Sequence, residues 1–287
     1  MKKDERKFLF VGNRYYVLKK MIELNLNVTE IYAVRDSYLA KMLEKEEITY
    51  RTLGAKKQFI DEVKMSDFDV LVSNGLPYIL PVSSMKKDSQ TFVNIHPSLL
   101  PDLKGTSPIN GAILFQRGHG VTCHLINDEI DGGDILAQIK IDNAKNFPLD
   151  LLYQVSFREE GQVFEEAYKN GFIPIEASAV SEPIYYSKKR SDAEITFLES
   201  FDELIHKIRA FSSPGQYAYI KSDKEEINVL AIDPIESDFL DQRYMEYPNK
   251  TNIFQWDTET LNILIKYDDK FCVLRIEYHQ NNFEIFK

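Results

Sequence analysis

Hydrophobic residues in the first part of the chain alternate between short continuous runs and segments with helical spacing. The continuous runs are typical of buried strands in a parallel sheet, and they cover residues 7–12, 27–34, 48–53 and 68–75. The segments between them repeat apolar residues every three or four positions, which predicts helices, and they cover residues 15–24, 37–46 and 55–65. Ser37 precedes the second helix and is its expected N-cap. This alternation predicts a Rossmann-like, doubly wound and mostly parallel sheet.

The pattern continues through the middle of the chain and changes near its end. The middle of the chain predicts strands at residues 91–95, 120–127 and 135–141 and helices at residues 107–117 and 149–171. Beyond residue 220 apolar and polar residues alternate, which predicts a small antiparallel sheet; its strands are expected at residues 227–232, 261–267, 271–278 and 281–286. We therefore expect an α/β catalytic domain at residues 1–181 and a β-rich C-terminal subdomain at residues 182–287.

Two polar side chains stand at the end of the strand that begins at residue 91. Asn94 and His96 lie two residues apart, so an extended chain projects both side chains from one face. The strand then meets Pro97 and a loop. Ligands of α/β sheets bind at this carboxyl end of the strands, so the pair predicts a polar functional site there.

An acidic turn follows the strand predicted at residues 120–127. It carries Asp128, Glu129, Asp131 and Asp134 together with two glycines. A carboxylate from this turn is expected to reach the histidine and to set its tautomer or its pKa. Either motif alone is more typical of a cap or a turn, and their occurrence in this order is what favours a functional site.

Composition excludes several classes of protein. The formal net charge of −10 argues against a general nucleic-acid binder. Cys123 and Cys272 form neither a disulfide framework nor a C-x-x-C metal site, and both are expected to be buried. The first βα turn reads VGNRY and lacks the dinucleotide fingerprint G-x-G-x-x-G. No run approaches about 18 apolar residues and no apolar leader follows the N-terminus, so we expect a cytoplasmic protein without a membrane span.

Several spaced motifs resemble one enzyme family. They are N-x-H-x-S-L-L-P from residue 94, the pair Lys104-Gly105, Pro108, G-V-T-x-H from residue 120, and D-x-G-x-I from residue 131. Together they resemble the folate-dependent formyltransferases, which include glycinamide ribonucleotide transformylase, methionyl-tRNA formyltransferase and the sugar-nucleotide N-formyltransferases. The resemblance covers most of residues 68–220. It implies that Asn94, His96 and Asp131 are the catalytic residues.

The same resemblance implies the ligands and their contacts. The co-substrate is 10-formyltetrahydrofolate, and no metal is needed. The loop at residues 75–81 is expected to line the folate pocket and the turn at residues 127–134 to close its other side. The implied folate contacts are Leu76, Tyr78, Ile79, Asn127 and Asp134, and the implied acceptor contacts are Lys104, Gly105 and Pro108. Many family members carry arginine where Lys104 stands, so here a point charge replaces a bidentate fork.

The residue types predict the chemistry of each catalytic group. In formyl transfer a neutral amine attacks the formyl carbon, and an oxyanion develops. The Asn94 amide is expected to donate a hydrogen bond to that oxyanion. His96 either takes a proton from the amine or, as imidazolium, donates to the oxyanion, and both roles stay open. Asp131 is expected to orient His96 or to relay protons.

Charge distinguishes among the possible acceptors. Residues 181–287 hold 13 Lys and Arg against 20 Asp and Glu, a balance of −7 that opposes binding of tRNA. The best fit is a nucleotide-linked amino-deoxysugar, with dTDP as the expected nucleotide and lipopolysaccharide O-antigen synthesis as the expected setting. We also expect a homodimer. Two alternatives stay open: a formyltransferase for methionyl-tRNA or another small amine, and a catalytically silent nucleotide-sugar-binding paralogue.

The last part of the chain holds several aromatic residues, including Trp256, the only tryptophan. These are expected to form core, with stacking on a nucleobase or a dimer contact as the lesser alternative. I-R-A-F-x-x-P-G, which contains Arg209, resembles a helix and turn of the same family. Arg209 is otherwise a solvated helix charge.

Overall fold

The structure is a computed structural model that describes residues 4–142, 144, 147–177, 180–221, 226–244 and 262–277. The chain forms two compact units. The first contains the residues up to 108 together with 118–144 and 153–187, and the second contains 109–117, 145–152 and the residues from 188 onward. The domain boundary expected after residue 181 stays a prediction, because compactness alone does not test independent folding.

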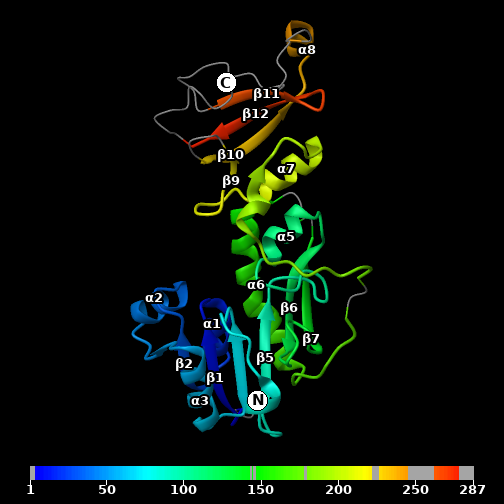
Figure 1. The fold of residues 1–287 in the computed structure, drawn as a ribbon. Helices are drawn as coiled ribbons and strands as arrows, with labels where there is room; N and C mark the ends of the chain where they lie inside the picture. The colour runs from blue at the N-terminus through cyan, green and yellow to red at the C-terminus, as the bar shows by residue number, and fades with distance from the viewer. Residues whose placement is uncertain are drawn as a thin grey trace. The chain divides into compact units, whose positions relative to one another are not determined.

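A seven-stranded sheet organises the first unit (Figure 1). The strand order is β3-β2-β1-β4-β5-β6-β7. Strands β1 to β5 are parallel to one another, and the pairs β5-β6 and β6-β7 are antiparallel. This confirms the predicted mostly parallel sheet. The strands are β1 (Lys7–Gly12), β2 (Asn27–Ala33), β3 (Arg51–Thr52), β4 (Val70–Asn74), β5 (Thr91–His96), β6 (His119–Leu125) and β7 (Ile135–Ile141).

Helices cover both faces of this sheet. Along β1, Phe8 and Phe10 belong to one buried cluster and Leu9 and Val11 to a second, because successive side chains of a strand point to opposite faces. The first cluster includes residues of α1, α2 and α6, and the second includes residues of α3 and α4. The helices that contribute to these clusters are α1 (Tyr16–Glu23), α2 (Tyr38–Lys45), α3 (Lys56–Met65), α4 (Val82–Met85) and α6 (Leu149–Lys169). Helix α5 (Pro108–Leu114) belongs, apart from Pro108, to the second unit.

Local signals at the element ends are partly confirmed. The Ser37 side chain accepts a hydrogen bond from the backbone N–H of Ala40 at 3.2 Å, so the predicted N-cap of α2 is correct. The strand predicted at 48–53 is too long, since only Arg51 and Thr52 pair with β2. This strand lies at the sheet edge, where one neighbour alone supplies hydrogen-bond partners.

The second unit contains the smaller sheet. Its order is β11-β12-β10-β9-β8; β8 and β9 are parallel, and the other pairs are antiparallel, which largely confirms the prediction. Its elements are η2 (Arg190–Ala193), β8 (Glu194–Ile195), α7 (Phe201–Ala210), β9 (Ala218–Lys221), β10 (Glu226–Ile235), α8 (Asp238–Tyr244), β11 (Asn262–Tyr267) and β12 (Lys270–Ile276). Trp256 and the strand predicted at 281–286 lie outside the described residues.

Two predictions about individual residues and segments can be checked directly. Cys123 and Cys272 are both free and fully buried, as expected of small apolar side chains. None of the helices in the described part of the chain combines the length and the hydrophobicity that crossing a membrane requires.

Candidate active site

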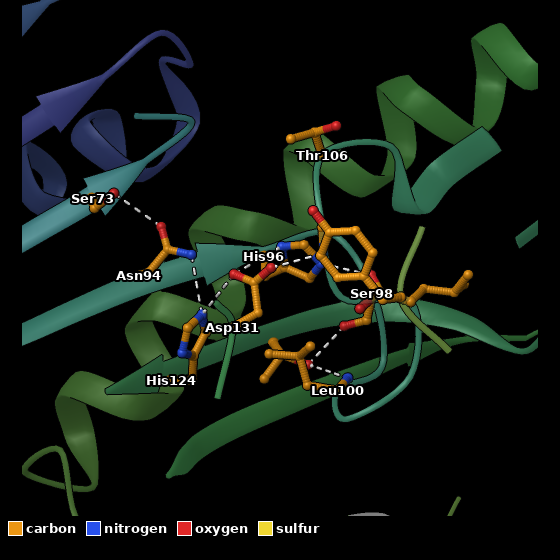
Figure 2. A network of polar contacts seen from close by, with 12 residues as sticks. Ser73, Asn94, His96, Ser98, Leu100, Thr106, His124 and Asp131 are labelled. Carbon is orange, nitrogen blue, oxygen red and sulfur yellow. Dashed lines mark hydrogen bonds and ion pairs between the residues drawn. The ribbon is translucent and has the colours of Figure 1, made fainter. Parts of the chain in front are cut away.

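The carboxyl end of β5 borders a cavity of about 380 Å³ in the first unit. Asn94 and His96 both line it, which confirms that the two side chains share a face of the strand. Asp131, from the turn between β6 and β7, lines the same cavity. The three residues predicted to be catalytic therefore meet at one place although they come from two segments of the chain (Figure 2).

Hydrogen bonds on both sides fix the orientation of the Asn94 amide. The Ser73 hydroxyl on the neighbouring strand β4 donates to Asn94 Oδ1 at 2.9 Å. Asn94 Nδ2 lies 3.1 Å from His124 Nε2 (Figure 2). His124 belongs to β6, which pairs with the other edge of β5. The hydroxyl can serve as the donor to the amide oxygen, so the amide nitrogen is directed to the histidine. One of its two N–H groups remains for a partner in the cavity.

One ring nitrogen of His96 is hydrogen-bonded to the backbone, and the other faces a carboxylate. Its Nε2 donates to the Leu103 carbonyl at 3.0 Å, since a carbonyl oxygen only accepts. Its Nδ1 lies 3.6 Å from Asp131 Oδ1. Burial lowers the pKa of His96, while the charge of Asp131 and the hydrogen bond to Leu103 act in the opposite direction. His96 is therefore a neutral ring whose Nδ1 can take a proton beside a carboxylate.

His124 is a buried neutral histidine behind Asn94. Its Nδ1 donates to the Leu125 carbonyl at 2.7 Å, which leaves the lone pair on Nε2 to accept from Asn94. Burial lowers the pKa of His124 to about 4, and the charge of Lys104 acts in the same direction, whereas the charge of Asp131 opposes the shift. The ring thus stays an acceptor at neutral pH.

The Asp131 carboxylate is held between these imidazoles and a backbone amide. Its Oδ1 lies 3.7 Å from His124 Nε2, and its Oδ2 accepts a hydrogen bond from the Gly105 N–H at 2.9 Å. Asp131 itself has a φ of +47°, a left-handed conformation that a residue other than glycine adopts at some cost. The turn is therefore shaped so that this side chain enters the cavity.

Four of the five residues expected to contact folate line the cavity. Leu76, Tyr78 and Ile79 come from the loop after β4, and Asn127 comes from the turn after β6. Asp134 is exposed and is not part of the lining; its backbone carbonyl accepts from the Leu125 N–H at 2.8 Å. The loop and the turn thus line one cavity, and the contacts of all five residues with folate stay predictions.

The expected acceptor contacts divide in a similar way. Gly105 and Pro108 line the cavity, whereas Lys104 does not. The charge of Lys104 nevertheless reaches the site, because it contributes to the lowered pKa of His124. Its direct contact with an acceptor remains a prediction.

Sequence reasoning left several residues of this cavity unassigned, and three of them interact with Asn94 or His96. They are Ser73, His124 and Arg14, which all line it. Arg14 forms an ion pair with the fully buried Glu160, whose pKa burial raises to about 6 although Arg14 opposes that shift. The one signal available for His124 was its place in G-V-T-x-H; its pairing with Asn94 follows from the register of β5 and β6.

Within the described residues, histidine, cysteine and acidic side chains form no group of three or more able to hold an ion. Near His96 the carboxylate Asp131 is already engaged by Gly105 and the imidazoles. The chemistry of these donors is that of hydrogen bonding and proton transfer.

Comparisons with known proteins point in one direction. Residues 31–167 match the family described as formyl transferase. Methionyl-tRNA formyltransferase of Pelagibacter ubique (strain HTCC1062) is 24% identical over 250 residues, 77% of this chain and 79% of that protein. The structure resembles WlaRD, described as a sugar 3N-formyl transferase in the presence of dTDP and 5-N-formyl-THF, with a TM-score of 0.69, 18% identity and coverage of 96% and 99% of the two chains.

A second solved structure shows the same fold. It is the N-formyltransferase from Helicobacter canadensis in complex with folinic acid and dTDP-3-aminofucose. Its TM-score is 0.68 at 18% identity, and the alignment covers 95% of this chain and all of that one. At this identity the likeness establishes the fold alone.

Proposed function

Because the chain belongs to the formyl transferase family, we propose that it transfers a formyl group from 10-formyltetrahydrofolate to the amine of a nucleotide-linked amino-deoxysugar. It is a folate-dependent formyltransferase, and the acceptor is the part that is proposed. The observation that carries the proposal is the meeting of Asn94, His96 and Asp131 on the wall of one cavity. An amide donor, an imidazole and a carboxylate are the groups that acyl transfer to an amine requires.

Asn94 supplies the oxyanion donor in this proposal. Ser73 and His124 hold its amide from two sides, at 2.9 and 3.1 Å, so the free N–H needs no reorientation during the reaction. A donor that is already aimed at the developing charge stabilises the transition state by several kcal/mol, about 3 to 4 where single donors have been removed. This pre-orientation supports Asn94 over other amides in the cavity as the oxyanion donor.

His96 and Asp131 supply the proton transfers. The amine must lose a proton after it attacks the formyl carbon, and the folate nitrogen must gain one when its bond to that carbon breaks. The lone pair of His96 Nδ1 accepts the first proton and returns it in the second step. Asp131, 3.6 Å away, stabilises the imidazolium between the two steps. Because Nε2–H donates to the Leu103 carbonyl, Nδ1 is the only basic atom of this ring. This favours the role of His96 as a general base over its role as an oxyanion donor.

The wall formed by the loop after β4 suits the co-substrate. Leu76, Ile79 and the ring of Tyr78 line it opposite polar residues of the turn after β6. The Tyr78 hydroxyl donates to the Gly54 carbonyl at 2.6 Å, so this ring has a fixed position. A volume of about 380 Å³ with mixed apolar and polar walls is in the range of small-molecule sites. Folate supplies the formyl group in an activated amide, and these residues would hold its pterin ring.

Charge and likeness together support the sugar acceptor. A sugar nucleotide requires one or two cations for its diphosphate, and Lys104 stands beside the site. The two structures of similar fold are described as a sugar 3N-formyl transferase and as a complex with dTDP-3-aminofucose. We propose an acceptor of the same class, with dTDP as the nucleotide. A homodimer and a place in O-antigen synthesis stay predictions.

A second candidate acceptor is methionyl-tRNA, because relatives of this chain are described as methionyl-tRNA formyltransferases. Binding a tRNA requires several phosphate contacts, each made by a lysine or an arginine. The balance of −7 in residues 181–287 opposes such contacts. We therefore place this acceptor second.

The deciding experiment compares acceptors directly. The protein is incubated with 10-formyltetrahydrofolate and either a panel of nucleoside-diphosphate amino sugars or methionyl-tRNA, at low and moderate ionic strength, and release of tetrahydrofolate is followed by absorbance. We expect turnover of an amino sugar and none of methionyl-tRNA. Formylation of the tRNA at a comparable rate that falls steeply with salt would overturn the choice of acceptor.

A matched pair of variants separates this site from the rest of the chain. His96→Ala should abolish turnover, whereas His206→Ala, on helix α7 of the second unit, should leave it unchanged. Equal rates for the two variants would show that the observed folate turnover does not arise at the β5 cavity.

A further inference from the structure

The segment at residues 184–187, here named the strap, runs along the loop at residues 102–106. The Lys104 N–H donates to the Ile184 carbonyl at 3.2 Å, and the Tyr186 N–H donates to the Lys104 carbonyl at 2.7 Å. The two segments thereby form a short parallel bridge. The strap follows the family-matched region, which ends at residue 167.

Side chains tie the two segments together at both ends of the bridge. Asp102 Oδ1 accepts from the N–H of Leu103 and from the N–H of Ile184, each at 3.0 Å. At the other end the Thr106 N–H donates to Ser187 Oγ at 3.0 Å. Asp102 is almost completely buried, so loss of its acceptor oxygen would leave backbone donors without a partner in the interior.

The loop makes the two contacts that orient the proposed proton-transfer residues. Its Leu103 carbonyl accepts from His96 Nε2 at 3.0 Å, and its Gly105 N–H donates to Asp131 Oδ2 at 2.9 Å. Within three residues, one loop therefore sets the direction of an imidazole from β5 and of a carboxylate from the turn between β6 and β7.

The backbone of this loop cannot hold that shape by local preference. Leu103 has a φ of +55°, on the left-handed side that L-residues avoid, and Gly105 has a φ of +107°, which is readily accessible only to glycine. A Cβ added at Gly105 would lie 2.6 Å from the Tyr186 carbonyl oxygen, so the strap also packs directly against the loop. Such conformations persist where surrounding contacts determine them, and the strap supplies those contacts.

We propose that the strap is a positioning element of the active site, which holds the loop at residues 102–106 so that Leu103 and Gly105 orient His96 and Asp131. The inference rests on the proposed function, in which these two residues move the protons. It predicts that catalysis depends on four residues that lie beyond the matched catalytic domain. None of the four needs to touch a reacting atom.

Kinetics of the full chain test the strap. Asp102→Ala and Ser187→Ala remove its side-chain ties, and Asp102→Asn retains an acceptor oxygen. Ser181→Ala, in the exposed approach to the strap, is the matched control. We expect kcat to fall on the order of 10²-fold in Asp102→Ala, because a small displacement of a catalytic group has effects of that size. Ser187→Ala should fall less, Asp102→Asn should recover most of the rate, and Ser181→Ala should match the wild type.

The pH profile distinguishes positioning from mere loss of stability. The groups that face His96 are Asp131, Arg14, His124 and the Leu103 carbonyl. The hydrogen bond to the Leu103 carbonyl raises the pKa of His96. When the loop moves away, the limb of the profile that belongs to His96 should shift to lower pH. A stability defect alone would lower the yield of folded protein and leave that limb in place.

An NMR measurement decides the point independently of activity. With the hydrogen bond to Leu103 intact, the His96 Nε2 proton should exchange slowly with solvent. In the Asp102→Ala variant its exchange rate should be at least about 10-fold higher. Unchanged exchange and an unchanged pH limb in both strap variants would overturn the proposal. If the wild type formylates no acceptor, the proposed function fails, yet the exchange rates still show whether the strap holds His96.

Discussion

The two ends of β6 each carry a buried histidine, and the two environments differ. His119 stands at the beginning of the strand and His124 near its end, and burial lowers their pKa values to about 3 and about 4. His119 Nε2 shares a hydrogen bond of 2.7 Å with the Ser156 hydroxyl, and its Nδ1 has no partner in the part of the chain that the structure describes. His124 instead meets Asn94, Asp131 and the cavity.

The comparison shows what distinguishes a functional histidine from a structural one. Burial and a low pKa are common to both ends of the strand, so neither property marks a site by itself. At the His124 end a carboxylate, an amide and an open volume lie within reach, and the neutral ring fixes the amide because its Nε2 accepts from Asn94. At the His119 end the neutral ring fills a core position.

The largest effect is expected at the cavity end. His96→Ala and Asn94→Ala should each lower kcat by at least ~10²-fold, the size associated with one general base or one oxyanion donor. Steady-state kinetics with an amino-sugar acceptor measure this, and circular dichroism checks that folding is retained. If either variant kept half of the wild-type rate, the substituted residue would not be catalytic.

The next effect separates the two buried histidines of β6 by activity. His124→Ala should lower kcat by ~10-fold or more with little change in KM, because the Asn94 amide loses the acceptor that fixes it. His124→Gln offers an amide oxygen in that direction and should restore part of the rate. An equal loss of kcat in His119→Gln would contradict the assignment of His124 as a positioning residue, since His119 does not line the cavity.

Stability should respond in the opposite way at the His119 end. Burial holds the pKa of His119 at about 3, below its unfolded value of about 6.5, so the unfolded state binds more protons between these pH values. Stability is therefore lost as the pH falls from about 6.5 towards about 3, by up to about 1.4 kcal/mol per pH unit for this group.

Replacing His119 by a non-titrating residue tests that sign. His119→Gln should be less stable at neutral pH, where the ring packs well, and should lose less stability on acidification. Denaturant unfolding at several pH values between 4 and 7 measures both quantities. A slope identical to that of the wild type would mean that the ring is not kept neutral by the fold.

The smallest effect concerns the rim of the cavity. Lys104→Ala should raise the KM for the nucleotide sugar several-fold and leave kcat nearly unchanged, because a phosphate contact is equally strong in the ground and transition states. Lys104→Arg serves as the control that retains the charge. An unchanged KM in Lys104→Ala would identify it as a solvated loop charge and would remove one support for the sugar-nucleotide acceptor.

Local sequence patterns predicted much of the fold. The alternation of apolar runs and helical spacing predicted the order of strands and helices in the first unit, and the serine before α2 predicted its cap. Local patterns failed where pairing decides the outcome. The strand expected at 48–53 is reduced to two paired residues at the sheet edge, because backbone partners come from the neighbouring strand and not from the segment itself.

The site divides along the same line. The two-residue spacing of Asn94 and His96 by itself determined that they share a face, since side chains of any strand alternate. The acidic turn predicted a carboxylate beside His96, and the resemblance to the formyltransferases selected Asp131 among its acidic residues. The partnership of Asn94 with His124 was decided only by tertiary structure, because it depends on the register between β5 and β6, which are separated by a loop and helix α5.

Tertiary structure alone also decided how the catalytic side chains are held. Leu103 and Asp131 adopt left-handed backbone conformations that their own preferences oppose. Contacts from residues far along the chain, such as the bond from Ile184 to Asp102, supply the compensating free energy. Sequence thus determined which groups stand at the end of β5, since that follows from local spacing, while their orientation required non-local hydrogen bonds that no local pattern encodes.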